Sequence, residues 1–402
     1  MTDTKKSLAL YVFSICCFYF CMPSMGIMTP TMATLSQAFP TVPFISITYI
    51  GTIVALFQIF GSFIGGAIVG KFLKFRTTLI LAFVLYLVGG LGPYFLPDGS
   101  SWTTVLVFRA IFGLGLGLNV PMGATLISRL YRDEAKRAKM MGFGMLFFNI
   151  GAFGFSYLGP SLALISWQTA FLAHFVGIVG LIGAIMLKEP PDAEEVKGAK
   201  VKITPRAVLW PLVFAIEMTL VYSMFTMGSM VLAQGGMDPN TAGMYQGTGI
   251  AILTAVGFVL SIGFGWIYRV VNKWIVAISM ICVTIGLFLV SSSGASLSIP
   301  LFLAGWVFFG IGQQGITNGL PMVVSTVVDK ATAAAALGLT FGFMNFGGFT
   351  STPWAQLLST IGADTAAAVI RANGIVFIVF TIVMIVATMR MKKFSSESEA
   401  AK

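Results

Sequence analysis

Twelve long apolar runs limit what this chain can fold into more than any other feature of its sequence. A helix needs about 20 apolar residues to cross the hydrocarbon core of a bilayer. The runs cover residues 7–35, 45–70, 78–96, 103–127, 139–164, 169–187, 207–233, 241–267, 274–293, 299–325, 334–358 and 366–390. Only 9% of the 402 residues are charged, whereas a soluble chain would carry about 25%. The sequence therefore predicts an all-α membrane protein with 12 transmembrane helices.

The lysines and arginines give the expected orientation. If the N-terminus is cytoplasmic, 22 of the 24 basic residues fall in or beside cytoplasmic segments. Arg371 is the one on the outer side, and Arg109 lies inside a span. This bias follows the positive-inside rule. We therefore expect an integral plasma-membrane protein, in a bacterial cytoplasmic membrane, with both termini cytoplasmic. The net charge of +10 is then a topology signal, and we expect no nucleic-acid partner.

The chain divides into two similar halves. A charged, Pro-bearing segment separates the sixth and seventh spans, which predicts an N-terminal six-helix half over 1–188, a cytoplasmic linker over 189–206 and a C-terminal six-helix half over 207–402. The motif FFNIGAF at 147–153 returns as FMNFGGF at 343–349. Likewise, FGLG at 112–115 returns as FGIG at 309–312. Parallel repeats of this kind predict a pseudo-symmetric pair of halves, with any binding site near the bilayer midplane between them.

Two motifs resemble those of the major facilitator superfamily. In the fourth span, Arg109, Gly113 and Gly115 are similar to its RxxxGxG signature. The turn after the second span matches the family pattern GxLaDRxGRK at Gly66, Ile68, Lys71 and Lys74, although Gly70 replaces the Asp that helps to latch the family's cytoplasmic gate. The resemblance covers the whole chain and implies the 12-helix major facilitator fold. It also implies that Gly66, Lys71, Lys74, Gly113 and Gly115 act in conformational gating.

A third motif points to one group within that family. Gly159-Pro160 in the fifth span keeps half of the GPxxGG motif of drug–proton antiporters. We expect both residues to act in gating as well. The acid that many such exporters carry in the first span is absent here. The resemblance is thus nearest to the 12-helix drug/proton antiporter-like group, although this chain lacks some of the motif residues of that group.

The resemblance implies secondary active transport by alternating access. The 36 Phe and 22 Met residues favour apolar, adaptable cavity walls. The residue content thus favours small, partly apolar organic substrates, and the resemblance to drug–proton antiporters implies their proton-coupled export. The alternative is an uptake carrier or exchanger for a small organic anion, with Arg109 as its counter-ion.

Three ionisable residues lie inside spans: Arg109, His174 and Glu217. Such residues are costly in a membrane and usually functional. We expect Glu217 and Arg109 to face one aqueous path from opposite halves, with Glu217 taking up and releasing protons and both residues contacting substrate. Each could instead clamp two helices together. For the single histidine, His174, we favour a hydrogen-bonded structural role over a proton relay.

Neutral amides complete the predicted binding site. Gln314 and Asn318 share one helix face at i,i+4 spacing, and Gln313 stands beside them. Gln246 in the eighth span is a further candidate. Amides suit substrate recognition because they donate and accept without a charge. Hydrogen bonding between helices is the competing interpretation.

Other classes of protein are disfavoured. The four cysteines form no metal or disulfide pattern, and the phosphate loop GxxxxGK[ST] is absent. No nucleophile–base pair occurs in the spans. We therefore expect no enzyme activity, no metal and no cofactor. The expected partners are a small-molecule substrate, protons and the lipid bilayer, and the expected state is a monomer.

Overall fold

The computed structural model describes residues 2–69, 72–131, 133–190, 205–327 and 330–390. These residues are helical nearly throughout and include no β-strand. The N-terminal half contains α1 (Thr2–Cys21), η1 (Met22–Thr31), α2 (Met32–Ala38), α3 (Phe44–Ile47), α4 (Tyr49–Ile68), α5 (Phe75–Leu91), η2 (Gly92–Phe95), α6 (Trp102–Leu130), α7 (Glu134–Ala163), η3 (Thr169–Val176) and α8 (Gly177–Met186).

The C-terminal half contains α9 (Pro205–Gln234), α10 (Pro239–Val271), η4 (Asn272–Trp274), α11 (Ile275–Ser296), α12 (Ile299–Val327), α13 (Lys330–Ser359) and α14 (Ala366–Arg390). Eleven helical segments of the described chain are long and apolar enough to cross a membrane. The remaining predicted span corresponds to α13, a helix of 30 residues that packs on α9 and α4. The 12-helix fold is thus confirmed. Most of the predicted linker over 189–206 lies outside the described residues.

The first and sixth spans are not uniform α-helices. The first changes to a 3-10 helix, η1, around Pro23 and Pro30. Proline has no N–H to donate and clashes with the preceding turn, so an α-helical ladder cannot continue unchanged through two of them. The sixth span begins with the 3-10 helix η3 before α8. Each 3-10 segment positions one group between helices: η3 positions the His174 side chain beside α6, and η1 positions the Ile27 carbonyl beside α7.

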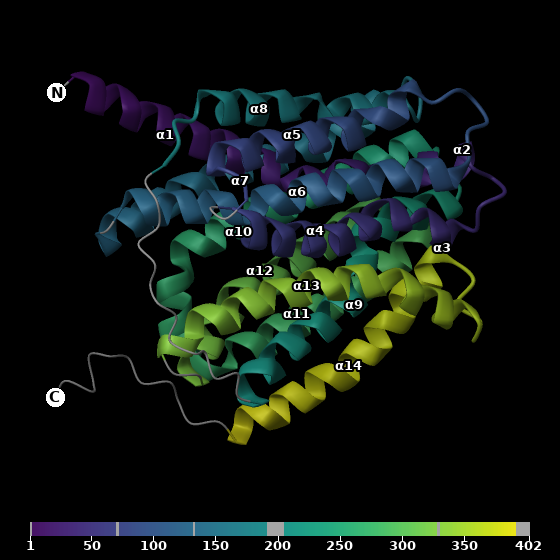
Figure 1. Ribbon diagram of the computed structural model, residues 1–402. Coiled ribbons are helices and arrows are strands. Elements are labelled where there is room, and N and C mark those ends of the chain that lie inside the picture. Colours follow the sequence, from purple (N-terminus) through teal and green to yellow (C-terminus); the bar gives the residue numbers. More distant parts are fainter. Residues whose placement is uncertain (1, 70–71, 132, 191–204, 328–329, 391–402) are drawn as a thin grey trace.

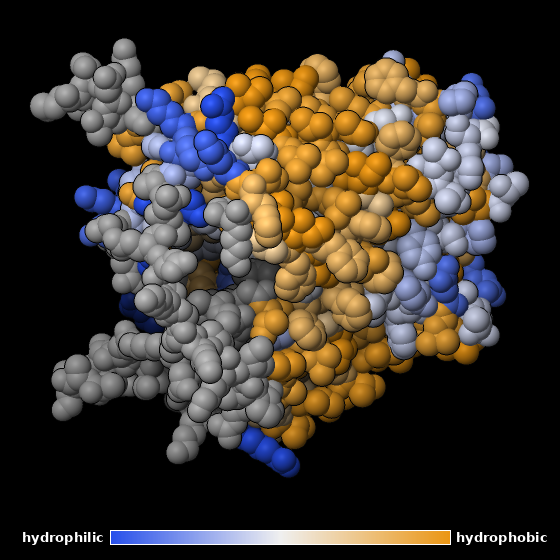
Figure 2. All heavy atoms as spheres, in the orientation of Figure 1, coloured by the Kyte–Doolittle hydropathy of each residue, from blue (hydrophilic) through white to orange (hydrophobic). Residues whose placement is uncertain are grey.

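Figure 1 shows the long helices running roughly side by side across the molecule. We call the end where α1 begins, α8 ends and α14 ends the linker end, and the end near α2 and α3 the far end. Figure 2 shows apolar side chains gathered in a broad band across the middle, with hydrophilic residues toward both ends. This pattern is that of a protein whose middle faces lipid. The surface is hollowed toward the linker end, beside the residues drawn in grey (Figure 2).

Hydrogen bonds join the two halves at the far end. The Thr352 hydroxyl of α13 lies 2.7 Å from that of Thr48 and 3.0 Å from that of Thr52. The Tyr49 hydroxyl donates to Gln356 at 3.2 Å. All of these partners are neutral, so the halves are held here by hydroxyl and amide contacts, which separate at a lower cost than buried ion pairs.

Candidate functional site

A close seam between α4 and α6 positions Arg109. The Arg109 side chain reaches the Ile50 carbonyl, Gly113 faces Val54, and Gly117 faces the Gln58 backbone. These contacts repeat every four residues along both helices. A Cβ atom at Gly113 would lie 2.8 Å from the Val54 oxygen, which leaves no room for a side chain. Small residues at i,i+4 spacing thus let the two backbones touch.

Gly115 faces the other way, onto α5. A Cβ atom at Gly115 would lie 2.5 Å from the Tyr86 nitrogen and 2.6 Å from the Ala82 oxygen. Helix α6 is therefore wedged between α4 and α5, with one glycine face for each. The expected gating role of Gly113 and Gly115 stays a prediction, but the packing shows why no larger residue fits either position.

The Arg109 guanidinium is fully buried and has two hydrogen-bond partners. Its Nε donates to the Ile50 carbonyl at 2.9 Å, and its Nη1 lies 2.9 Å from Nε2 of His174. The guanidinium carbon stands 4.5 Å from the centre of the Phe112 ring, a cation–π contact. Nη2 has no hydrogen-bond partner. The Nη2 donor of this buried cation thus has no acceptor inside the protein.

His174 completes this arrangement from η3. Its Nδ1 lies 3.1 Å from the Phe171 carbonyl, and its side chain is fully buried. A guanidinium can only donate, so Nε2 must accept from Arg109 and Nδ1 must carry the ring proton. We assign the neutral tautomer on that ground. The hydrogen-bonded role expected for His174 agrees with this geometry, but its partner was not foreseen, because 65 residues separate His174 from Arg109 in the chain.

Glu217 lies in α9 and is 1% exposed. The Gln313 side chain of α12 stands beside its carboxyl group. Neither Glu217 oxygen has a hydrogen-bond partner of standard geometry, and Oε1 of Gln313 also lacks one. The structure therefore groups Glu217 with Gln313. Arg109 is paired with His174 instead, because the seam with α4 directs its side chain toward η3. That Arg109 and Glu217 face one aqueous path from opposite halves stays a prediction.

The other predicted amides lie between helices. Gln246 of α10 donates from Nε2 to the Met224 and Phe225 carbonyls of α9, at 3.0 and 2.9 Å. Gln314 rests against Gly257 of α10, where a Cβ atom would lie 2.5 Å from its amide carbon. Asn318 donates to the Ser261 hydroxyl at 3.4 Å. These contacts match the interhelical interpretation, since a glycine or a small polar residue opposite each amide gives it space.

The turn after α4 holds the remaining gating candidates. Gly66 is exposed, with no atom within 4 Å of a Cβ placed there. Lys74 immediately precedes α5, and Lys71 lies outside the described residues. The carboxylate of Glu189 accepts from the Phe75 and Arg76 backbone nitrogens, at 2.6 and 3.1 Å. This acid caps the N-terminus of α5, a contact that sequence reasoning missed because 113 residues separate Glu189 from Arg76.

The Gly159–Pro160 pair lies where the halves meet. Gly159 packs directly on the Ile27 carbonyl of η1. Pro160 faces α10 of the other half: its side chain is 3.7 Å from a Cβ placed on Gly243 and 3.4 Å from one placed on Gly247. The gating role stays a prediction, and the position at a three-helix junction is what such a role requires.

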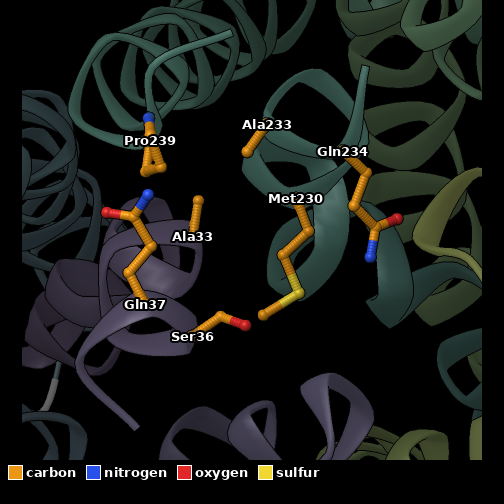
Figure 3. Close-up of a pocket in the computed structure, with 7 residues that line it drawn as sticks. All are labelled: Ala33, Ser36, Gln37, Met230, Ala233, Gln234 and Pro239. Atoms are coloured by element: carbon orange, nitrogen blue, oxygen red, sulfur yellow. The ribbon is translucent and has the colours of Figure 1, made fainter. Parts of the chain in front are cut away.

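A crevice of about 180 Å³ opens at the far end, between the halves. Figure 3 shows Ala33, Ser36 and Gln37 on one wall and Met230, Ala233 and Gln234 on the other, with Pro239 beside Gln37. The Gln234 amide oxygen accepts from the Ala366 nitrogen at 2.8 Å, so it is committed to α14. No predicted site residue lines this crevice. Within the described chain, no group of three or more His, Cys, Asp or Glu side chains could hold a metal ion.

Comparisons with known proteins agree with this architecture. The nucleoside transporter NupG superposes with a TM-score of 0.71 at 10% identity, covering 95% of this chain and 100% of its own. A POT family transporter in complex with 5-aminolevulinic acid gives 0.74 at 14% identity, covering 96% and 97%. A D-xylose–proton symporter gives 0.70 at 16% identity, covering 96% and 98%.

At these identities the solved structures establish the fold alone. A comparison with curated proteins gives no match. The family profile described as Major Facilitator Superfamily matches residues 8–352, most of the chain. The 12-helix fold and this match together place the protein among membrane transporters, and the chain belongs to the major facilitator superfamily.

Proposed function

We propose that this protein is a proton-coupled secondary transporter that exports small, partly apolar organic compounds by alternating access. The observation that carries the coupling is the carboxyl group of Glu217, which is buried between α9 and α12 and has a neutral amide, not a cation, beside it. The membrane would be the bacterial cytoplasmic membrane, with both termini in the cytoplasm.

A proton can be carried at Glu217 because its charge has no partner there. An ionised carboxylate in an apolar interior is costly without a counter-charge or a full set of hydrogen bonds. The protonated acid avoids that cost and can donate to the unpartnered Gln313 oxygen. When the halves rearrange and water reaches this position, the water solvates the carboxylate and lowers the free-energy cost of its charge. Conformation and proton binding would thereby be linked.

Alternating access requires the far end to open, and the contacts there suit this motion. The halves meet through neutral groups such as Thr48, Thr52 and Thr352. Each such hydrogen bond contributes about 0.5–1.5 kcal/mol net. In the proposed orientation the far end would be the outer side, and these contacts would keep the protein closed to the outside. Gly159 and Pro160 at the junction, and the glycine faces of α6, would allow the packed helices to slide.

A second candidate, exchange or uptake of a small organic anion, is favoured by Arg109. Its two described hydrogen-bond partners are neutral, so neither cancels its charge. Its Nη2 edge is unsatisfied. A carboxylate or phosphate of a substrate would supply both the charge and the acceptor.

Transport in proteoliposomes separates the two candidates. A thermal-shift screen first selects ligands, because a ligand that binds the native state stabilises it. The panel combines apolar amphipathic drugs with uridine, D-xylose and 5-aminolevulinic acid, which sample the compound classes named for the similar structures. An entrapped pH dye then reports proton movement. Opposite movement of substrate and proton supports the exporter, while electrically silent anion exchange without proton movement supports the second candidate.

A further inference from the structure

The contact between Arg109 and His174 leaves the guanidinium with a defined orientation. Nε is held by the Ile50 carbonyl of α4, and Nη1 is held by the His174 ring of η3. The Cδ atom bonded to Nε lies in the same plane, so these two contacts together with the side-chain bond fix the plane of the guanidinium and its rotation. The remaining donor edge, Nη2, therefore has one direction only.

The His174 ring is itself held rigidly. Nδ1 donates to the Phe171 carbonyl at 3.1 Å, which fixes the tautomer as well as the ring. Phe112 meets the ring edge to face at 4.8 Å, and Phe171 stacks at 6.1 Å. Gly90 of α5 makes room for it, because a Cβ atom there would lie 2.6 Å from that of His174.

The oriented group lies close to the opposite half. Helix α4, whose Ile50 carbonyl accepts from Nε, also packs on α13 of that half. Tyr222 of α9 and Ala55 of α4 both face Gly348 of α13. A Cβ atom placed on Gly348 would lie 3.4 Å from the Tyr222 ring and 3.7 Å from the Ala55 side chain. The arginine is thus a charge held in the N-terminal half by a helix that packs against the opposite half.

We propose that His174 is a positioning residue for Arg109: its neutral ring accepts from Nη1 and thereby directs the Nη2 edge toward the substrate path between the halves. The proposal deepens the proposed function and rests on it only for the identity of the path. It applies to both candidate functions, since each needs Arg109 in one orientation. The claim itself is that the Arg109–His174 contact fixes the orientation of the guanidinium.

The first test uses the fact that the chain has a single histidine. Protein labelled with ¹⁵N-histidine and placed in nanodiscs gives ring nitrogen signals from His174 alone. At neutral pH we expect a protonated Nδ1 and an unprotonated Nε2 that accepts a hydrogen bond. In Arg109→Lys the Nε2 signal should move, while in Arg371→Lys it should not. An Nε2-protonated or doubly protonated ring, or no response to Arg109→Lys, overturns the proposal.

The second test measures the guanidinium without any substrate. Phenylglyoxal modification is followed at Arg109 by mass spectrometry, with exposed Arg371 as the internal reference. His174→Asn keeps an amide near Nδ1 but loses the acceptor at Nε2, whereas His174→Gln places an amide oxygen near the Nε2 position. Loss of a hydrogen bond to a charged group should raise Arg109 reactivity about tenfold in His174→Asn. His174→Gln should restore the wild-type rate, and equal reactivity in all three proteins overturns the proposal.

Transport connects the contact to activity. For the panel compound that the wild type carries, His174→Asn should raise KM about tenfold with a smaller change in kcat, and His174→Gln should recover most of it. If the wild type carries no compound of the panel, the proposed function fails while the two tests above still decide the positioning role. If both tests succeed and His174→Asn transports like the wild type, the contact is structural and the proposal is wrong.

Discussion

The carboxyl group of Glu217 lies beside the amide of Gln313, on neighbouring helices of the C-terminal half, with no cation among its described contacts. Arg109, which we expect to face the same aqueous path, donates to His174 in the N-terminal half. The buried cation and the buried acid thus lie on separate helices, Arg109 on α6 and Glu217 on α9. The two groups can be perturbed independently, which makes the proposed mechanism testable by single substitutions.

Replacing Glu217 with Gln should abolish substrate-driven proton movement and leave the fold intact. The variant mimics the protonated acid and removes a costly buried charge, so its unfolding temperature should not fall. Proton movement is measured with the entrapped dye, and stability by thermal unfolding in detergent. Asp364→Asn, at an exposed acid outside the helices, is the control and should couple normally. Proton movement that survives in Glu217→Gln would exclude this residue as the coupling acid.

Replacing Gly117 with Ala should destabilise the protein by about 1–3 kcal/mol, because the new methyl group meets the Gln58 backbone. Two further glycines provide matched controls. Neither Gly66 nor Gly142 has any atom within 4 Å of an added Cβ, so alanine should be tolerated at each. Thermal unfolding followed by size-exclusion fluorescence compares the three. Equal unfolding temperatures would mean that the α4–α6 seam yields more readily than its contacts indicate.

Replacing Thr352 with Val should loosen the far end. The variant loses hydroxyl contacts to both Thr48 and Thr52, and the closed population should fall by about tenfold relative to open forms. Spin labels at Gln37 and Asp238, both exposed at that end, report the separation of the halves. Thr360→Val is the control, since the Thr360 hydroxyl bonds only within its own half, to Leu357. An unchanged distance distribution in Thr352→Val would show that apolar packing alone keeps this end closed.

Replacing Glu189 with Ala should weaken the N-terminal half. Its carboxylate caps the first two backbone nitrogens of α5, and loss of a helix cap costs about 1 kcal/mol. Glu189→Gln retains an acceptor without the charge and should fall between the wild type and Ala. Amide hydrogen exchange at the start of α5 measures the effect locally. Exchange there that is as slow in the alanine variant as in the wild type would contradict the capping role.

Local patterns accounted for much of this protein. The twelve spans were predictable because each must satisfy its backbone hydrogen bonds internally within the membrane. The close face of α6 was predictable from Gly113 and Gly117, since helical periodicity alone places them together. The pairing of Arg109 with His174 was not predictable in this way. It depends on how η3 packs against α6, and no local rule relates two residues 65 positions apart.

The sequence by itself determined the class of fold and the identity of the buried ionisable residues, because hydrophobicity acts along the chain. The tertiary structure alone decided which polar groups meet. It brought Arg109 to His174, Glu217 to Gln313 and Glu189 to the start of α5, and it placed Gln246, Gln314 and Asn318 between helices. The physical reason is that a buried polar side chain takes the partner that its helix packing presents, and that packing is set by contacts between residues far apart in the chain.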